Sequence, residues 1–403
     1  MTEESQSNNR RPYLKWLLLL AILIFTISIS HRKGNDINVY LHAADQLWDG
    51  SDPFVSNPYN NYLYGPSFAL LLKPLTLLGY PIARVIWALI CMLCLYRVWH
   101  IFRHDILARS ALGEKQKSWI GFVLLLLSVN VYIHNLNLGQ VTLPILWCLI
   151  EGLNRIRKGD LIIGGFILAM GIDMKILPLL ALYYLFLKGR IQPIIITVIS
   201  LLVIMLIPAV FIGWETNLDF HIHWLDVINP VGKRFAAEIN DGCISINCLL
   251  SRLPLEDGVM SLLTNILRLI VLVIMSIFYI KRRKVELTTM DHWRDWSIML
   301  LGVLMIFPHQ MKYSMLFIVP AGAYLLVRFI VQGKKWNSYY IIGAFCLVIP
   351  AIMGRDIIGN ATTDFLDTIG ILGILTIVLF VLLLIPSAAS VKEIQQKDPI
   401  KIH

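Results

Sequence analysis

The sequence predicts an all-α integral membrane protein that crosses the bilayer many times. Of its residues, 57% are apolar and only 15% are charged, whereas about 25% are charged in a typical soluble domain. The apolar residues form long runs without the alternation of strands, and only helices or closed barrels can span a bilayer. The cations behind the net charge of +9 cluster in short segments between these runs, as in cytoplasmic loops.

The apolar runs are long enough to define individual helices. They predict about twelve spans, near residues 13–30, 81–102, 118–134, 140–154, 161–172, 174–187, 191–212, 260–280, 296–308, 313–330, 337–353 and 366–386. The first run lacks a small-residue cleavage site, so we expect it to remain as a signal anchor. Polar breaks at Gly171–Lys175 and Pro308–Lys312 each separate two short helices. Such a break at membrane depth must be packed against protein or line a water-filled cavity, because its backbone groups need hydrogen-bond partners.

The distribution of lysine and arginine predicts the topology. The basic segment before the first span places the N-terminus in the cytoplasm, and an even number of spans returns the C-terminus there. The basic segment His31–Lys33 is the exception, because it falls on the opposite side. We expect a single multi-pass domain over residues 1–403 in the inner (plasma) membrane, with long extracytoplasmic loops at 31–80 and 213–259.

Both long loops contain stretches in which apolar residues recur at helical spacing. These stretches are Asp36–Gly50 and Asn217–Pro230, and each predicts a helix that lies in the membrane interface. Residues 65–79, which include Lys73 and Pro74, predict a partly embedded helix. The polar residues of the loops and helix breaks are therefore expected to converge on one extracytoplasmic cavity.

The cysteines and glycines give no sign of a metal or nucleotide site. Cys91 and Cys94 lie inside an apolar run and are expected to pack there, whereas Cys243 and Cys248 can form a disulfide if their loop faces an oxidising compartment. The sequence has no Walker A motif, no GxGxxG motif, no prominent DxD pair and no His/Cys cluster. We expect no metal, no cofactor and no nucleic-acid partner.

Several polar residues beside the membrane are candidates for function. Asp36 is a candidate because an ionisable group there needs compensation, although it could instead cap a helix. Asp45 and Asp49 are expected to be solvated. Lys175 could pair locally with Asp173 or bind an anionic lipid headgroup, and two further candidates, His309 and Lys312, lie in the second helix break.

Neutral polar and aromatic residues allow two interpretations each. Asn137 and Gln140 suit sugar hydroxyls, and they are equally suited to capping the following helix. Trp48, Tyr59, Tyr62, Tyr64 and Trp224 are interpreted as an aromatic belt at the interface rather than as sugar-stacking residues.

Four segments occur in an order and spacing that resemble a known family. They are "DINVYLHAADQLWDGSDPF…YNNYLYGPSFALLLKPLTLL", "LGQVTLPILWCLI", "GGFILAMGIDMKILPLLAL" and "CISINCLLSRL". Together they resemble the polyprenyl-phosphate-mannose-dependent α-mannosyltransferases of glycosyltransferase family 87, over roughly residues 10–330. Many members have S-P-x-S-W-x-H-H after a late span, with a histidine thought to act as base. This chain has "FPHQMKYSM" there, which leaves His309 out of register.

The resemblance implies a GT-C fold with its active site on the extracytoplasmic face. It implies transfer of a mannose-like hexose, with inversion, from a polyprenyl-phosphate-linked donor to a glycan or glycolipid acceptor in cell-envelope glycan biosynthesis. The alternatives are a multi-span transporter or a lipid-linked glycan ligase or polymerase. Transporters usually have short outer loops and repeat symmetry, which this sequence lacks.

The implied reaction assigns roles to the candidate residues. The leaving lipid phosphate needs cations, and those available on the expected side are Lys175, Lys312, Arg234 and Arg355. The candidates for the base that activates the acceptor are Asp36, which is preferred, and His309. The expected sugar- and acceptor-binding residues are Tyr40, Tyr64, Asn137, Gln140, Ser245, Asn247 and Gln310.

Overall fold

The computed structural model describes residues 24, 27, 28, 35–55, 58, 59, 61–110, 112–229, 242–308, 310–333 and 336–385. Within these ranges the regular elements are helices, apart from one isolated antiparallel bridge between Cys243 and Met311. Most of the first predicted span and the basic segment after it lie outside the described residues, as do Arg234 and His309.

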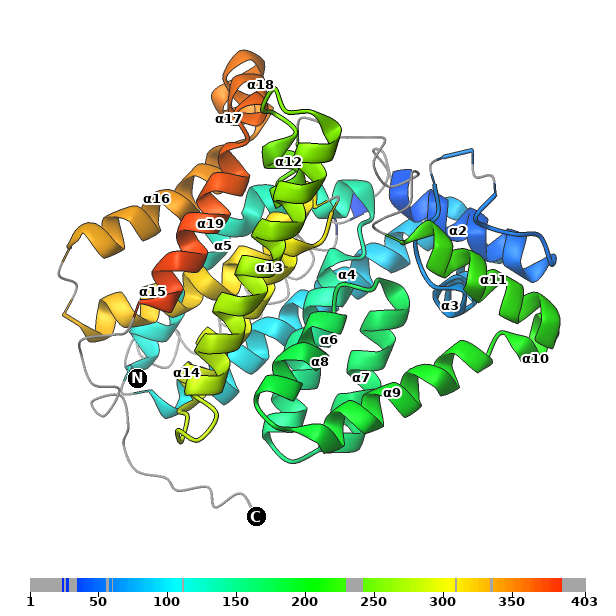
Figure 1. Ribbon diagram of the computed structural model, residues 1–403, viewed down its shortest axis with the longest axis horizontal. Helices are drawn as coiled ribbons and strands as arrows, with labels where there is room; N and C mark the ends of the chain where they lie inside the picture. Colours follow the sequence, from blue (N-terminus) through cyan, green and yellow to red (C-terminus); the bar gives the residue numbers. More distant parts are fainter. Residues whose placement is uncertain are drawn as a thin grey trace, which may run out of the picture.

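Two groups of helices pack side by side (Figure 1). The first comprises α2 (Asn35–Trp48), α3 (Pro66–Thr76), α4 (Tyr80–Ile101), α6 (Thr142–Arg157), α7 (Leu161–Met174), α8 (Leu179–Leu187), α9 (Ile191–Leu206), α10 (Ala209–Ile212) and α11 (Trp214–Val227). The second comprises α5 (Glu114–Leu138), α12 (Ile246–Leu250), α13 (Asp257–Lys281), α14 (Thr289–Ile306), the 3-10 helix η3 (Lys312–Ile318), α15 (Val319–Val331), α16 (Ser338–Ile352), α17 (Arg355–Ile358), α18 (Asn360–Thr368) and α19 (Ile371–Leu384).

Five described helical segments are long and apolar enough to cross a bilayer. They are Tyr80–Ile106, Glu114–Leu138, Ile191–Ile212, Asp257–Lys281 and Lys312–Val331, and the bent pair α18 and α19 would make a sixth. Helices α7 and α16 are apolar but shorter. The protein is thus an all-helical, multi-pass membrane protein, while the count of about twelve spans stays a prediction.

Both predicted helix breaks are present. Helix α7 ends at Met174, Lys175 is extended with φ −160° and ψ 136°, and α8 begins after Pro178. Proline at this position cannot continue the helix because it lacks an N–H group. Helix α14 ends before Phe307, which is also extended, and the chain resumes as the 3-10 turns of η3. Each break therefore places polar side chains at the end of an apolar helix.

The two predicted amphipathic helices are confirmed, but α2 is more enclosed than expected. Its successive residues Val39, Tyr40 and Leu41 are all buried, because α3 and α4 pack on the faces that an interfacial helix would leave exposed. Asp49 is exposed as expected. Asp45 is partly exposed and forms an ion pair with Lys73 at 2.8 Å, so the purely solvated interpretation of Asp45 is wrong.

The aromatic-belt interpretation is wrong for three residues. Tyr62, Tyr64 and Trp224 are buried inside the protein, whereas a belt residue needs contact with the headgroup region. The hydroxyl of Tyr62 donates a hydrogen bond to the carbonyl of Gly65 at 2.9 Å. Trp48 remains exposed. The loop after α2 is therefore a packed part of the protein.

The end of α9 anchors these enclosed helices. Pro208 has no N–H group, so it cannot donate to the Ile204 carbonyl one helical turn earlier. The hydroxyl of Ser67 on α3 donates to that carbonyl at 3.0 Å. The side-chain amide of Asn217 on α11 donates to the neighbouring Met205 carbonyl at 3.1 Å. The Ile204 carbonyl also accepts from the Ile207 amide at 3.1 Å. Side chains of two helices from different loops thus add hydrogen bonds to the C-terminal end of α9.

Candidate active site

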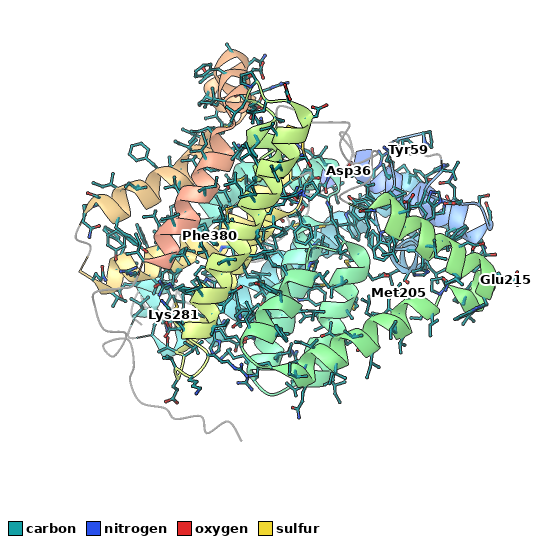
Figure 2. All side chains as sticks on the ribbon, in the orientation of Figure 1. Asp36, Tyr59, Met205, Glu215, Lys281 and Phe380 are labelled. Carbon is teal, nitrogen blue, oxygen red and sulfur yellow. A yellow bond between two sulfur atoms is a disulfide. The ribbon has the colours of Figure 1, made fainter. Side chains whose placement is uncertain are left out.

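Asp36 lies in the first turn of α2, at the end of this helix that faces the middle of the molecule (Figure 2). The side-chain amide of Gln140 donates a hydrogen bond to its carboxylate. Gln140 is only 3% exposed and follows the C-terminus of α5. Asp36 is therefore held by a contact between distant segments, which local capping would not require.

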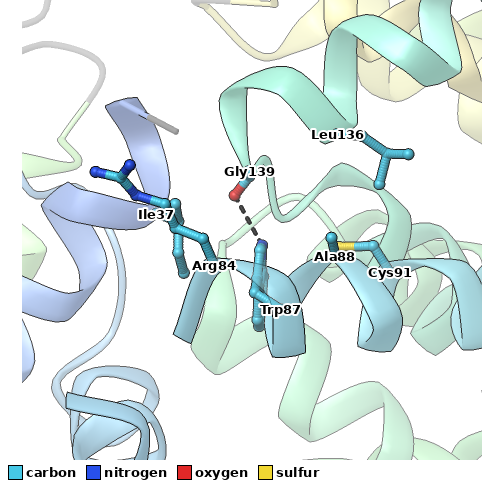
Figure 3. A pocket seen from close by; sticks show the side chains of 7 residues that line it. All are labelled: Ile37, Arg84, Trp87, Ala88, Cys91, Leu136 and Gly139. Atoms are coloured by element: carbon cyan, nitrogen blue, oxygen red, sulfur yellow. Dashed lines mark hydrogen bonds between the residues drawn. The ribbon is translucent and has the colours of Figure 1, made fainter. Parts of the chain in front are cut away.

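A glycine makes the contact between α2 and α5 possible. Gly139 ends α5 with φ +72°, and a Cβ there would lie 2.7 Å from the Cβ of Ile37. Its carbonyl accepts a hydrogen bond from the indole of Trp87 on α4 at 2.8 Å (Figure 3). Glycine suits a left-handed conformation and the close approach of another chain segment. Gly139 thus sets Gln140 beside Asp36.

Lys175 is enclosed by aromatic rings at the break after α7. Its ammonium lies 5.6 Å from the ring centroid of Tyr64 and 5.9 Å from that of Tyr313. Tyr40 on α2 donates its hydroxyl to the Tyr64 hydroxyl at 3.1 Å. These distances are those of cation–π contacts, which stabilise a cation withdrawn from water. We call Asp36, Gln140, Lys175, Tyr64 and Tyr313 the Asp36–Lys175 site.

The backbone next to Tyr64 is fixed against α7. The Gly65 amide donates to the Asp173 carbonyl at 3.0 Å, and a Cβ at Gly65 would lie 2.3 Å from that same oxygen. Among the described residues no ion pair joins Asp173 to Lys175, so the local pairing considered from the sequence is not found. Tyr64 and Lys175 are instead brought together by packing between the start of α3 and the end of α7.

Burial and mutual attraction both act on the two charged groups of the site. Burial raises the pKa of Asp36 to about 6, although the nearby Lys175 charge and the Gln140 hydrogen bond oppose this change. Burial lowers the pKa of Lys175 to about 8, opposed by the Asp36 charge. Desolvation disfavours each charged form, while the opposite charge favours it. Near neutral pH, Asp36 can accept a proton and Lys175 carries a positive charge.

The other predicted phosphate-binding cations have carboxylate partners or lie outside the described residues. Lys312 is ion-paired with Asp367. Arg355 pairs with Asp364 at 3.0 Å, and both of these side chains are more than half exposed. Arg234 and His309 lie outside the described residues. Of the four predicted cations, Lys175 is thus the one that the described contacts place beside Asp36.

A second polar cluster surrounds a disulfide between Cys243 and Cys248. Ser245 is fully buried there and donates its hydroxyl to the Cys248 sulfur at 3.2 Å, while Asn247 accepts a long 3.5 Å contact from Thr264. The Ile244 amide donates to the Gln310 carbonyl at 2.7 Å. The disulfide loop thereby holds the segment that leads into Tyr313. Ser245, Asn247 and Gln310 belong to this cluster, and Asn137 lies on the last turn of α5.

Tyr313 is a site residue that the sequence interpretation missed. It occupies the start of η3, directly after Lys312, and its ring faces the Lys175 ammonium. Its position within "FPHQMKYSM", where the resemblance described above leads one to expect histidine, was the signal that could have identified it. In the described part of the chain, no group of three or more His, Cys, Asp and Glu side chains is arranged to hold a metal ion.

Opening the disulfide is expected to impair the site as well as the fold. A Cys243→Ser/Cys248→Ser double variant should be less stable by about 2 kcal/mol, the contribution expected of a disulfide that closes a short loop. Its kcat/KM should also fall several-fold, because the segment that carries Gln310 loses its support. The measurements are thermal unfolding and sugar-transfer rates, with Cys346→Ser as the buried-thiol control. Reaction of all cysteines with a thiol reagent in the denatured, unreduced protein would contradict this account.

The fold and the site define a multi-pass membrane protein with a partly buried carboxylate and lysine at the ends of its helices. The model of glycosyltransferase family 87 matches residues 62–308, which is more than half of the chain and includes Tyr64, Gln140 and Lys175. The chain belongs to this family and is a membrane glycosyltransferase. This confirms the family predicted from the sequence. No curated protein matches the chain significantly.

Proposed function

We propose that this glycosyltransferase moves a mannose-like hexose from a polyprenyl-phosphate-linked donor to a hydroxyl group of a glycan or glycolipid acceptor. The reaction takes place on the extracytoplasmic face of the inner membrane and inverts the anomeric configuration. The observation that carries the proposal is the Asp36–Lys175 site, in which a base and a cation lie together among aromatic rings.

The two charged residues divide the chemistry between them. Asp36 accepts the proton of the acceptor hydroxyl as its oxygen bonds to the anomeric carbon of the donor sugar. The bond from that carbon to the phosphate oxygen breaks at the same time, and its electron pair leaves with the lipid phosphate. Lys175 stabilises the negative charge on the departing phosphate. The Tyr64 and Tyr313 rings shield Lys175 in part from water, which strengthens this interaction.

An apolar cavity beside the site supports a lipid-linked donor. It has a volume of about 600 Å³ and is lined by residues of α2, α3, α7, α9 and α10, including Phe68, Phe166 and Met174. Met174 directly precedes Lys175. Such a cavity can bury part of an isoprenoid chain while the phosphate at its end reaches the lysine.

The proposed roles of Asp36 and Lys175 predict a bell-shaped pH dependence. A base works only when it has lost its proton, so kcat/KM is expected to rise with pH through about 6, the raised pKa of Asp36. A cation binds phosphate only while protonated, so kcat/KM is expected to fall above about 8, the lowered pKa of Lys175. Initial rates measured from acidic to alkaline pH test this. A flat profile across the acidic limb would contradict the role of Asp36.

The direct test is sugar transfer by the purified protein in detergent micelles. The donor is a synthetic polyprenyl-phosphate mannose with a radiolabelled sugar, and the acceptor is a mixture of short mannosides and glycolipids. We expect label to move to the acceptor with the wild-type protein and not with the Asp36→Asn variant. Transfer from a nucleotide-linked mannose, with none from the lipid-linked donor, would overturn the proposal.

A further inference from the structure

Three buried side-chain amides in the Asp36–Lys175 site or on the segments next to it have an oxygen with no hydrogen-bond donor. They belong to Asn135, Gln140 and Gln310, which are 1%, 3% and 1% exposed. Within the described residues, no donor reaches the oxygen of any of the three. A buried polar atom without a partner is costly and rare in native proteins, so these oxygens call for a water molecule or a ligand.

The orientation of each amide is fixed by its nitrogen. The Asn135 amide donates to the carbonyls of Val131 and Tyr313, both at 2.9 Å. The Gln140 amide donates to the Asp36 carboxylate, and the Gln310 amide donates to the Pro308 carbonyl at 3.3 Å. Rotating any of these groups would set its oxygen against another acceptor. The atom left without a partner is therefore the oxygen in all three, and each needs a donor.

Backbone contacts connect the three amides to the site. The Gln140 backbone amide donates to the Asn135 carbonyl at 3.0 Å, so the last turn of α5, which carries Asn135, is hydrogen-bonded to the residue that follows its C-cap. Asn135 also holds the carbonyl of Tyr313, whose ring faces Lys175. Gln310 lies on the segment that leads into Tyr313. The acceptor oxygens thus come from the segments that carry Gln140 and Tyr313 into the site.

The charges of the site complement one kind of sugar. Lys175 is the cation that the described contacts place beside Asp36, and in the proposed reaction it serves the donor phosphate. Sugar hydroxyls can donate hydrogen bonds to amide oxygens. A sugar carboxylate cannot donate when ionised, so it would meet these acceptor oxygens and the Asp36 charge unfavourably.

We propose that Asn135, together with Gln140 and Gln310, recognises the hydroxyl groups of an uncharged transferred sugar and discriminates against uronic acids. Asn135 is a specificity-determining residue that the family resemblance did not indicate. The inference rests on the proposed function, because it describes the sugar that the same site transfers. Beyond the proposed function, it names the side chains that bind the hydroxyl groups of that sugar and the chemical class of sugar that they exclude.

The test compares polyprenyl-phosphate donors that carry mannose, each of its monodeoxy forms, or mannuronate. With the wild-type protein, we expect at least one deoxy donor to lose roughly tenfold to a hundredfold in kcat/KM, because an amide oxygen is left unpaired. Mannuronate should be transferred at least about a hundredfold more slowly than mannose. In the Asn135→Leu variant, one deoxy donor that is slow with the wild-type protein should react no more slowly than the mannose donor, because the acceptor oxygen for its missing hydroxyl is gone.

A second variant and a control keep the outcome decisive. Gln310→Met removes another acceptor oxygen with little change in side-chain shape. If the Asn135→Leu protein does not fold, Gln310→Met is tested with the same donors in its place. Gln192→Met, on the exposed start of α9, should retain the full wild-type penalty. Equal rates for all deoxy donors, or efficient mannuronate transfer, would overturn the inference while the proposed function stands. Absence of transfer from the mannose donor itself would instead refute the proposed function.

Discussion

The Asp36→Asn variant is expected to fold normally and to lose sugar transfer by a factor of at least about a thousand in kcat, within the range for removal of a general base. Asparagine has nearly the same size as aspartate and can still hydrogen-bond to Gln140, but it cannot accept the acceptor proton. If Asp36 only stabilised the first turn of α2, asparagine would serve almost as well. Transfer from the radiolabelled lipid-linked donor measures the difference.

The matched control for this variant is Asp49→Asn. Asp49 lies just beyond the other end of the same helix and is exposed, so its neutralisation should leave the rate near that of the wild-type protein. Thermal unfolding of both variants shows whether the fold is retained. An Asp36→Asn protein that keeps a tenth or more of the wild-type kcat would remove Asp36 from the role of base.

Lys175→Met is expected to lower kcat/KM by about a hundredfold to a thousandfold, as when one preorganised donor to a developing anion is lost. Methionine fills a similar volume between the Tyr64 and Tyr313 rings but carries no charge. The lysine charge also lowers the pKa of Asp36. Its removal should therefore raise that pKa further and move the acidic limb of the residual pH profile to higher pH.

Two comparisons distinguish this effect from general damage. Lys117→Met removes a lysine that pairs with Glu114 in the first turn of α5, and it should leave transfer unchanged. Lys175→Arg should rescue transfer poorly, because the guanidinium is larger and planar and does not fit a space shaped for an ammonium. An unchanged donor KM and kcat in Lys175→Met would exclude Lys175 from phosphate binding.

Much of the local structure could be predicted because its causes lie in neighbouring residues. The helix break before α8 follows from Pro178 and the polar residues in front of it, and the helical spacing of apolar residues predicted α2. The enclosure of α2 could not be predicted in this way. It depends on α3 and α4 covering a second face, which is a property of tertiary packing.

The candidate site was predictable only in part for the same reason. Asp36 and Lys175 were each predicted as candidates because they are charged groups beside the membrane. The pairing of Lys312 with Asp367, by contrast, joins segments far apart in the chain. No spacing in the sequence indicates it. Tyr313 was missed because a tyrosine next to an apolar run is typical of the membrane interface, and its contact with Lys175 depends on how two helix breaks meet.

The anomeric configuration of the product tests the central claim most directly. The purified protein is given a β-linked polyprenyl-phosphate mannose and a simple mannoside acceptor, and the new linkage is determined by nuclear magnetic resonance. Direct displacement with Asp36 as base and Lys175 on the phosphate predicts an α-linked product. A β-linked product would require a covalent sugar–enzyme intermediate and would contradict the role assigned to Asp36.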